Sequence, residues 1–287
     1  MASLGKNHVE KIANEWSRYG LRIRPGVETL NLITREIDGT ECNRILILGA
    51  TPELVDFFLR KKAGRITLID WSEVTVKAME SLGLEDWTGV EKITADWRTR
   101  QEHLGKSFDI ISGDCPFNMV SFPEDWETVL RHLSAYLIPG GLIIVRNMFY
   151  PTIPFSFPVF LKDALRHLRK MNRNKDSFKD LVSAIRLGAY IGSVDSRSLI
   201  LRERELQLER EACEKLKTMV NSQEDLEIIE SLLGVKKEGK PQRGATLPRK
   251  EDVAEIFHAA GFMVKSFQPA ENQFRLGASF LLTAVKA

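Results

Sequence analysis

Short apolar runs alternate with helical patterns between residues 44 and 148. Residues 45–48 and 66–69 are apolar almost throughout, as strands buried on both faces of a sheet are. Between them, Thr51 and Pro52 supply a helix-capping residue and a proline at the first helical position. Three further strands are expected at residues 90–94, 108–112 and 142–145. This alternation predicts βαβ units on a parallel sheet.

The strand–helix alternation is then interrupted by a long helical stretch. One more helix is expected to end at the Pro-Gly-Gly of residues 139–141, but residues 151–245 show no further strand pattern. Within residues 202–217, ten of sixteen side chains are charged, so the apolar stripe of this helix is narrow. The members of the stripe are Leu206, Cys213, Leu216 and Val220. Residues 151–245 are therefore predicted to form an inserted helical subdomain.

The strand–helix pattern resumes at Pro248 with a helix that runs to Gly261. Two strands follow, at residues 262–267 and 278–285, and the connection between them is short enough for a hairpin. Such a connection predicts antiparallel neighbours. The predicted fold class is therefore α/β, a doubly wound and mostly parallel seven-stranded sheet with a helical insertion after strand 5.

The composition of the chain argues against a nucleic-acid-binding protein, a membrane-spanning protein and a metal site. The chain has 287 residues, with 41 Lys and Arg against 39 Asp and Glu, and this balance argues against a dedicated nucleic-acid binder. No apolar run approaches the length of about 18 residues that a membrane-spanning helix needs. The three cysteines form no CxxC pair, which suits a reducing compartment, and the five histidines lack metal-ligand spacing. We expect a cytoplasmic protein without a metal site and without a nucleic-acid or membrane partner.

A glycine and an acid occur where an open α/β sheet binds its ligands. Gly49 occupies the first strand-to-helix turn, and Asp70 ends the second strand 21 residues later. An acid at that place binds ribose hydroxyl groups, although a strand-end aspartate can also simply cap a helix. The turn lacks the further glycines of the G-x-G-x-x-G pattern, which let a backbone approach a pyrophosphate. The pattern therefore favours a nucleoside ligand without a diphosphate.

An acid–aromatic pair, Asp96 and Trp97, follows the third predicted strand. A carboxylate at a strand end can accept a hydrogen bond from an exocyclic amine, and an indole offers a flat apolar face to a purine. The alternative is a helix-capping aspartate beside a core tryptophan. We interpret the pair as a candidate adenine contact.

Together these features resemble the class I S-adenosylmethionine-dependent methyltransferases. The likeness covers residues 44–148 and 248–287, including the strand that begins at Phe108, the Pro-Gly-Gly lead-in to the fifth strand and the paired last strands. One glycine, Gly49, stands where that family has two or three. The resemblance implies S-adenosyl-L-methionine as the cofactor and the small-molecule branch of the family. The cofactor-binding residues that it implies are Gly49, Ala50, Thr51, Asp70, Trp71, Asp96, Trp97, Asp114 and Cys115.

Methyl transfer from a sulfonium is an in-line displacement from an activated donor, so the protein mainly positions the acceptor and excludes water. The Asp114-Cys-Pro-Phe117 segment partly resembles the Asp-Pro-Pro-Tyr motif of amino-methyltransferases, with Cys115 in place of the first proline. Arg146 is a candidate partner for a substrate carboxylate, with a salt bridge inside the fold as the alternative. The candidate catalytic residues are Asp114, Asn118 and Tyr150. The candidate substrate-contacting residues are Tyr19, Arg24, Phe117, Arg146 and Asn147.

The predicted function is S-adenosylmethionine-dependent methyl transfer to an oxygen or nitrogen of a small molecule. Two alternatives stay open: another displacement on the same cofactor that releases methylthioadenosine, and a non-catalytic nucleoside-binding module. An NAD-linked dehydrogenase is the competitor at the level of the fold. The charged helix at residues 202–217 leaves a homodimer open. The expected domains are an N-terminal helical lid (1–35), a Rossmann-like cofactor-binding domain (36–150 and 246–287) and a helical insertion that covers the substrate site (151–245).

Overall fold

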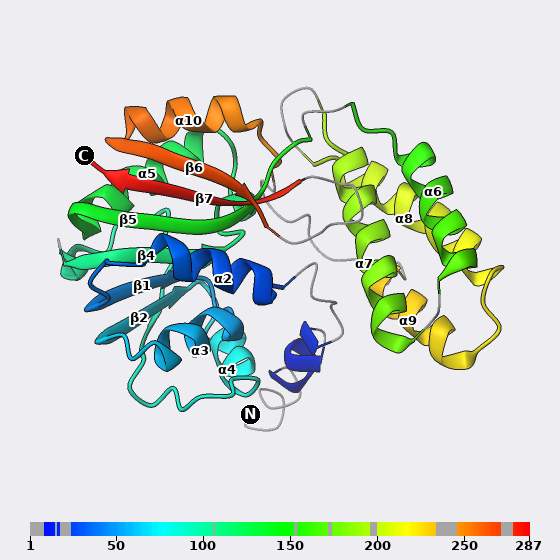
Figure 1. The fold of residues 1–287 in the computed structure, drawn as a ribbon, viewed down its shortest axis with the longest axis horizontal. Helices are drawn as coiled ribbons and strands as arrows, with labels where there is room; N and C mark the ends of the chain where they lie inside the picture. Colours follow the sequence, from blue (N-terminus) through cyan, green and yellow to red (C-terminus); the bar gives the residue numbers. More distant parts are fainter. Residues whose placement is uncertain are drawn as a thin grey trace.

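One seven-stranded sheet organises the described part of the chain (Figure 1). The computed structural model describes residues 9–14, 16–17, 24–105, 107–151, 154–171, 174–195, 200–233, 246–270 and 278–287. The strands lie in the order β3-β2-β1-β4-β5-β7-β6. Their bounds are β1 Arg44–Leu48, β2 Arg65–Asp70, β3 Glu91–Thr94, β4 Phe108–Asp114, β5 Leu137–Met148, β6 Phe262–Pro269 and β7 Ser279–Lys286.

The sheet is mixed rather than purely parallel. Strands β1 to β5 pair in parallel, whereas β7 runs antiparallel to both of its neighbours, β5 and β6. This reversed strand confirms the antiparallel last pair that the short connection predicted. The connection itself, residues 271–277, lies outside the described residues.

Helices cover both faces of the sheet because side chains alternate along each strand. On β1, Ile45 and Ile47 belong to a buried cluster with α2, α3 and α4, while Leu46 and Leu48 belong to a second cluster with α5 and α10. The bounds of these helices are α2 Val27–Glu36, α3 Pro52–Arg60, α4 Glu73–Glu80, α5 Glu124–Tyr136 and α10 Lys250–Ala259. Two short 3₁₀ helices complete this part of the chain, η1 Glu102–Leu104 and η2 Phe117–Met119.

The end of α5 differs from the sequence expectation. The helix ends at Tyr136, and β5 begins with the next residue, so the Pro-Gly-Gly of residues 139–141 lies inside the strand. Leu137 pairs with Phe108 on β4 ahead of an irregularity in the ladder. Pairing with a neighbouring strand has therefore overridden the helical spacing of Leu137, which the sequence pattern assigned to the helix.

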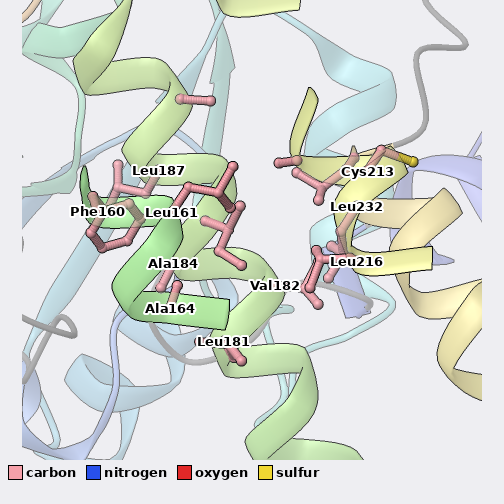
Figure 2. Packing of buried hydrophobic residues seen from close by; sticks show 14 of the residues in the cluster. Phe160, Leu161, Ala164, Leu181, Val182, Ala184, Leu187, Cys213, Leu216 and Leu232 are labelled. Atoms are coloured by element: carbon pink, nitrogen blue, oxygen red, sulfur yellow. The ribbon is translucent and has the colours of Figure 1, made fainter. Parts of the chain in front are cut away.

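Four helices follow β5 and form a layer of their own beside the sheet (Figure 1). Apolar side chains of α6 and α7 meet those of α8 and α9, and many of them are fully buried (Figure 2). The sheet reaches this core through Met148, Tyr150 and Ala278. The bounds of the four helices are α6 Phe157–Lys170, α7 Lys175–Gly192, α8 Arg202–Lys217 and α9 Gln223–Leu233.

The buried face of α8 is more polar than its predicted apolar stripe. Glu205 and Glu209 are buried on it, whereas Leu206 is only half-buried. An ion pair accounts for one of the two acids, because Arg186 on α7 lies 3.5 Å from the Glu209 carboxylate. Hydrophobic periodicity could not identify a helix face that uses charge to pack.

The buried Asp56 carboxylate connects α3 to the loop after α4. It accepts hydrogen bonds from the backbone N–H of Leu84 at 2.7 Å and of Glu85 at 3.3 Å. The indole N–H of Trp87 donates a third at 2.8 Å. One side chain therefore satisfies three donors that the loop would otherwise leave unpaired.

Replacing Asp56 by alanine is expected to lower the free energy of unfolding by about 2–4 kcal/mol, because these donors lose a charged acceptor inside the protein. Urea denaturation measures the change. Asp86→Ala is the matched control, since Asp86 bonds only its neighbour Thr88 at an exposed position and should cost far less. Equal costs for the two variants would contradict a structural role for Asp56.

Gly188 on α7 lies against the Phe160 ring of α6. A Cβ atom at this position would lie 2.5 Å from a ring carbon of Phe160. Gly188→Ala is therefore expected to lower the free energy of unfolding by about 1–3 kcal/mol through overpacking. Gly89→Ala is the control because nothing lies within 4 Å of the corresponding position. A neutral Gly188→Ala in thermal denaturation would mean that the Phe160 ring moves aside at no cost.

Candidate functional site

Strand register brings four of the predicted site residues to one edge of the sheet. Leu48 of β1 is level with Ile69 of β2 and with Gly113 of β4, and Asp114 is level with Arg146 of β5. The strand order reverses direction between β1 and β4, and open α/β sheets bind ligands outside the carboxyl ends of strands at such a point. The residues gathered at this edge are Gly49, Asp70, Asp114 and Arg146.

The Gly49 turn is tight and lies against an indole ring. Gly49 has a φ of +81°, and its N–H donates to the Ile69 carbonyl at 2.9 Å. A Cβ atom here would lie 3.9 Å from Cη2 of Trp97. Residues that carry a Cβ atom rarely adopt a positive φ, so glycine suits the geometry of this turn. The next two residues, Ala50 and Thr51, are buried.

Asp70 connects this turn to the start of α4. Its carboxylate accepts from the Ala50 N–H at 2.9 Å and from the Ser72 N–H at 2.9 Å. Ser72 itself caps α4 by accepting from the Thr75 N–H. Burial raises the pKa of Asp70 although these backbone bonds favour the charged form. Asp70 thus stabilises the backbone of two turns and also lies at the binding edge. Its contact with a ribose stays a prediction.

Two predicted aromatic contacts differ in exposure. Trp71, directly after β2, exposes 64% of its surface, which is unusual for a tryptophan and leaves the ring available to a ligand. Trp97 is partly buried against the core on the α5 side, and His132 Nδ1 lies 3.3 Å from its carbonyl oxygen. Trp97 and Gly49, placed far apart in the sequence, are therefore neighbours.

Asp96 is engaged by a side chain that the sequence analysis did not consider. Arg98 bonds both carboxylate oxygens of Asp96, at 2.6 Å from Nη2 and 3.0 Å from Nε. These bonds lower the pKa of Asp96. Arg98 also lies 3.5 Å from Asp125. An adenine amine at this place would share Asp96 with a guanidinium group.

Asp114 and Arg146 form a buried ion pair. Arg146 Nε donates to Asp114 Oδ1 at 2.6 Å and Nη2 donates to Oδ2 at 3.0 Å, with side chains 3% and 5% exposed. The remaining guanidinium nitrogen, Nη1, donates to the Arg24 carbonyl at 3.2 Å. Of the two alternatives for Arg146, the structure has the salt bridge inside the fold. Both carboxylate oxygens of Asp114 are therefore engaged by Arg146, and a catalytic role for Asp114 stays a prediction.

The structure does not bring Phe117 to the ligand-binding edge. Its ring is fully buried and packs on Trp126 and Phe257, at centroid distances of 4.8 and 5.7 Å. The segment that resembles an amino-methyltransferase motif therefore uses its aromatic residue in the core. Cys115 stands where that motif has its first proline. Its φ is +53° and its N–H donates to the Arg146 carbonyl at 2.6 Å, whereas proline has a fixed negative φ and no N–H.

Asn118 holds three segments together through one amide. Its Nδ2 donates to the carbonyls of Met148 and Thr246, both at 2.8 Å, and its Oδ1 accepts from the Met148 N–H at 2.8 Å. Both N–H groups of this amide are used, and its Oδ1 accepts one hydrogen bond. Its visible role is to fix the end of β5.

The other candidate residues have distinct surroundings. Tyr150 packs against the core of α6–α9, and its N–H bonds the Pro248 carbonyl at 2.9 Å. Asn147 is fully buried on the opposite face of β5 from Arg146, level with Phe280, and its amide has no hydrogen-bond partner among the described residues. Tyr19 lies outside the described residues.

Glu53 lies at the binding edge, although it was not among the predicted site residues. Its Oε1 is 3.1 Å from Arg24 Nε and 3.4 Å from Trp16 Nε1. Burial raises the pKa of Glu53, and the nearby Asp114 carboxylate adds to the effect. The available signal was its position four residues after Gly49, in the first turn of α3.

Two further classes of feature are absent from the described part of the chain. It contains no group of three or more His, Cys, Asp or Glu side chains that could hold a metal ion. None of its helices is both long and apolar enough to cross a membrane.

Comparison with known proteins gives structural likeness without sequence likeness. No known family profile matches the chain, and no curated protein matches its sequence. The structure resembles the PH0226 protein of Pyrococcus horikoshii OT3 over 91% of this chain and 89% of that one, at 14% identity and a TM-score of 0.52. It also resembles the CurJ carbon methyltransferase over 91% of this chain and 54% of that one, at 13% identity and a TM-score of 0.50.

A third similar structure, from Rhodobacter sphaeroides, is provisionally described as a zinc-dependent alcohol dehydrogenase. It matches over 96% of this chain and 98% of that one, at 14% identity and a TM-score of 0.50. Other similar structures contain S-adenosylmethionine or S-adenosylhomocysteine, at TM-scores of 0.46 to 0.48. Dinucleotide-binding sheets typically have the order 3-2-1-4-5-6, whereas this sheet inserts a reversed β7 between β5 and β6. The chain has the fold of the class I S-adenosylmethionine-dependent methyltransferases.

Proposed function

We propose that the chain binds S-adenosylmethionine and transfers its methyl group to an oxygen or nitrogen of a small molecule. The observation that carries the proposal is the edge between β1 and β4, where the Gly49 turn meets Trp97 and rests on Asp70. Acidic side chains gather there and the turn has a single glycine, so a cationic nucleoside suits this edge better than a diphosphate.

The residues at the edge fit such a cofactor. A carboxylate has about four lone-pair sites, and the Asp70 carboxylate accepts two backbone N–H groups, which leaves capacity for ribose hydroxyls. Trp71 offers an exposed aromatic surface for the adenine, and Trp97 offers a second one next to the turn. In this proposal Asp70 holds the ribose and the two indoles hold the base.

The bound cofactor supplies a methyl group already activated by a sulfonium. The chain therefore has to orient the acceptor and exclude water rather than provide a nucleophile. The ion pair of Asp114 and the backbone hydrogen bonds of Asn118 agree with a positioning role for these two side chains. In the proposal, α6–α9 supply the wall that encloses a small acceptor, with Tyr150 where the sheet meets that layer.

The proposal is tested by binding and then by product analysis. Titration calorimetry should detect S-adenosylmethionine binding and no NAD binding. Incubation with panels of phenols, carboxylates and amines, followed by mass spectrometry, should detect S-adenosylhomocysteine that depends on the acceptor. Methylthioadenosine as the product would instead indicate displacement elsewhere on the sulfonium, and NAD binding alone would contradict the proposal.

Trp71→Ala is expected to weaken S-adenosylmethionine binding by about 1–3 kcal/mol, the cost of losing a stacked base. The melting temperature should stay nearly constant because the ring is largely exposed. Leu84→Ala is the matched control, since Leu84 is 86% exposed and lies on the loop after α4. Unchanged affinity in Trp71→Ala, measured by calorimetry, would remove Trp71 from the adenine site.

A further inference from the structure

The two carboxylate oxygens of Glu53 have unequal surroundings. Oε1 faces both Arg24 Nε, at 3.1 Å, and Trp16 Nε1, at 3.4 Å. Oε2 is buried and has no hydrogen-bond partner among the described residues. An ionised oxygen without a donor inside a protein costs free energy that a bound donor would recover. Glu53 Oε2 is thus an acceptor open to a ligand, and Arg24 and Trp16 fix its position.

The position of this acceptor is that of the ligand-binding edge. Glu53 lies in the first turn of α3, which the Gly49 turn opens, and the Asp114 carboxylate is close enough to raise the pKa of Glu53. Arg146 directs its guanidinium at Asp114 and at the Arg24 carbonyl. The described residues leave Oε2 open to a donor from a ligand, and the surrounding acids favour a positively charged one.

We infer that Glu53 Oε2 accepts a hydrogen bond from the α-ammonium group of the amino-acid part of S-adenosylmethionine, an inference that rests on the proposed function. The ammonium has N–H groups that satisfy the vacant oxygen, whereas a sulfonium carries positive charge but no such donor. Glu53 then selects adenosine compounds that carry an amino acid over those that do not. Arg24 and Trp16 keep the carboxylate in place through Oε1.

Three ligands separate the contributions. S-adenosylmethionine has both the ammonium and the sulfonium, S-adenosylhomocysteine has the ammonium alone, and methylthioadenosine has neither. In calorimetry, Glu53→Gln should weaken binding of the first two by about 10- to 100-fold, the range of a charge-assisted hydrogen bond. Methylthioadenosine should bind the variant as it binds the wild type, which also reports that the variant is folded.

Glu73→Gln is the matched control. Glu73 occupies the first turn of α4 as Glu53 occupies that of α3, but it is exposed and pairs with Lys77 at 2.5 Å. This variant should bind all three ligands like the wild type. A Glu53→Gln effect confined to S-adenosylmethionine would overturn the inference in favour of the sulfonium. An unchanged affinity, or an equal loss for all three ligands, would overturn it as well.

Failure of the proposed function gives a different result, because the wild type would then bind none of the three adenosine compounds. A wild type that binds them while Glu53→Gln shows no selective loss leaves the proposed function intact and refutes the role of Glu53. The two failures are therefore distinguishable in one set of titrations.

Acidification supplies an independent readout. The groups that face Glu53 are Arg24, Trp16 and Asp114, and the net effect of burial and these neighbours is a raised pKa. As the pH falls, the raised pKa lets Glu53 gain a proton before an ordinary glutamate would, while the α-ammonium of the ligand stays charged. The affinity ratio of S-adenosylhomocysteine to methylthioadenosine should fall in the wild type and stay flat in Glu53→Gln. A falling ratio in the variant would contradict the inference.

Discussion

The ion pair between Asp114 and Arg146 is the interaction on which the binding edge depends. It joins the ends of β4 and β5, and Arg146 extends the connection to the backbone of Arg24. Two charges remain inside a protein only when each has a partner of good geometry. The pair thus fixes the ends of β4 and β5 beside Glu53, whose Oε2 has no hydrogen-bond partner among the described residues.

Much of the fold could be predicted from hydrophobic pattern and turn chemistry. The parallel strands up to β5, the starts of α3 and α4 and the reversed last strand follow from apolar runs, from Thr51-Pro52 and Ser72, and from a short connection. The position of Asp70 at the edge followed from its place at the end of the second predicted strand of a doubly wound sheet. These features depend on local sequence or on general rules of α/β topology, so a single sequence suffices to find them.

The partners of individual side chains could not be predicted in the same way. Phe117 and Asn118 have residue types suited to an acceptor site, yet the first packs on Trp126 and the second bonds Met148 and Thr246. Only the tertiary arrangement decides whether such a side chain faces the ligand or the core. The same reason explains Glu205 and Glu209, which charge patterning assigns to solvent and which the packing of α8 buries. A sequence motif therefore gives the residue types of a site but not the positions of their side chains.

The separate core of α6–α9 has a consequence for how this protein can change. Its buried apolar side chains pack on one another (Figure 2). Met148, Tyr150 and Ala278 join this core from the strand ends. Substitutions at distant, independent sites usually add in their effects on stability. Mutations that remodel this layer can therefore accumulate without disturbing strand register around Gly49 and Asp70. The α6–α9 layer can therefore vary in sequence while the sheet keeps the geometry of the binding edge.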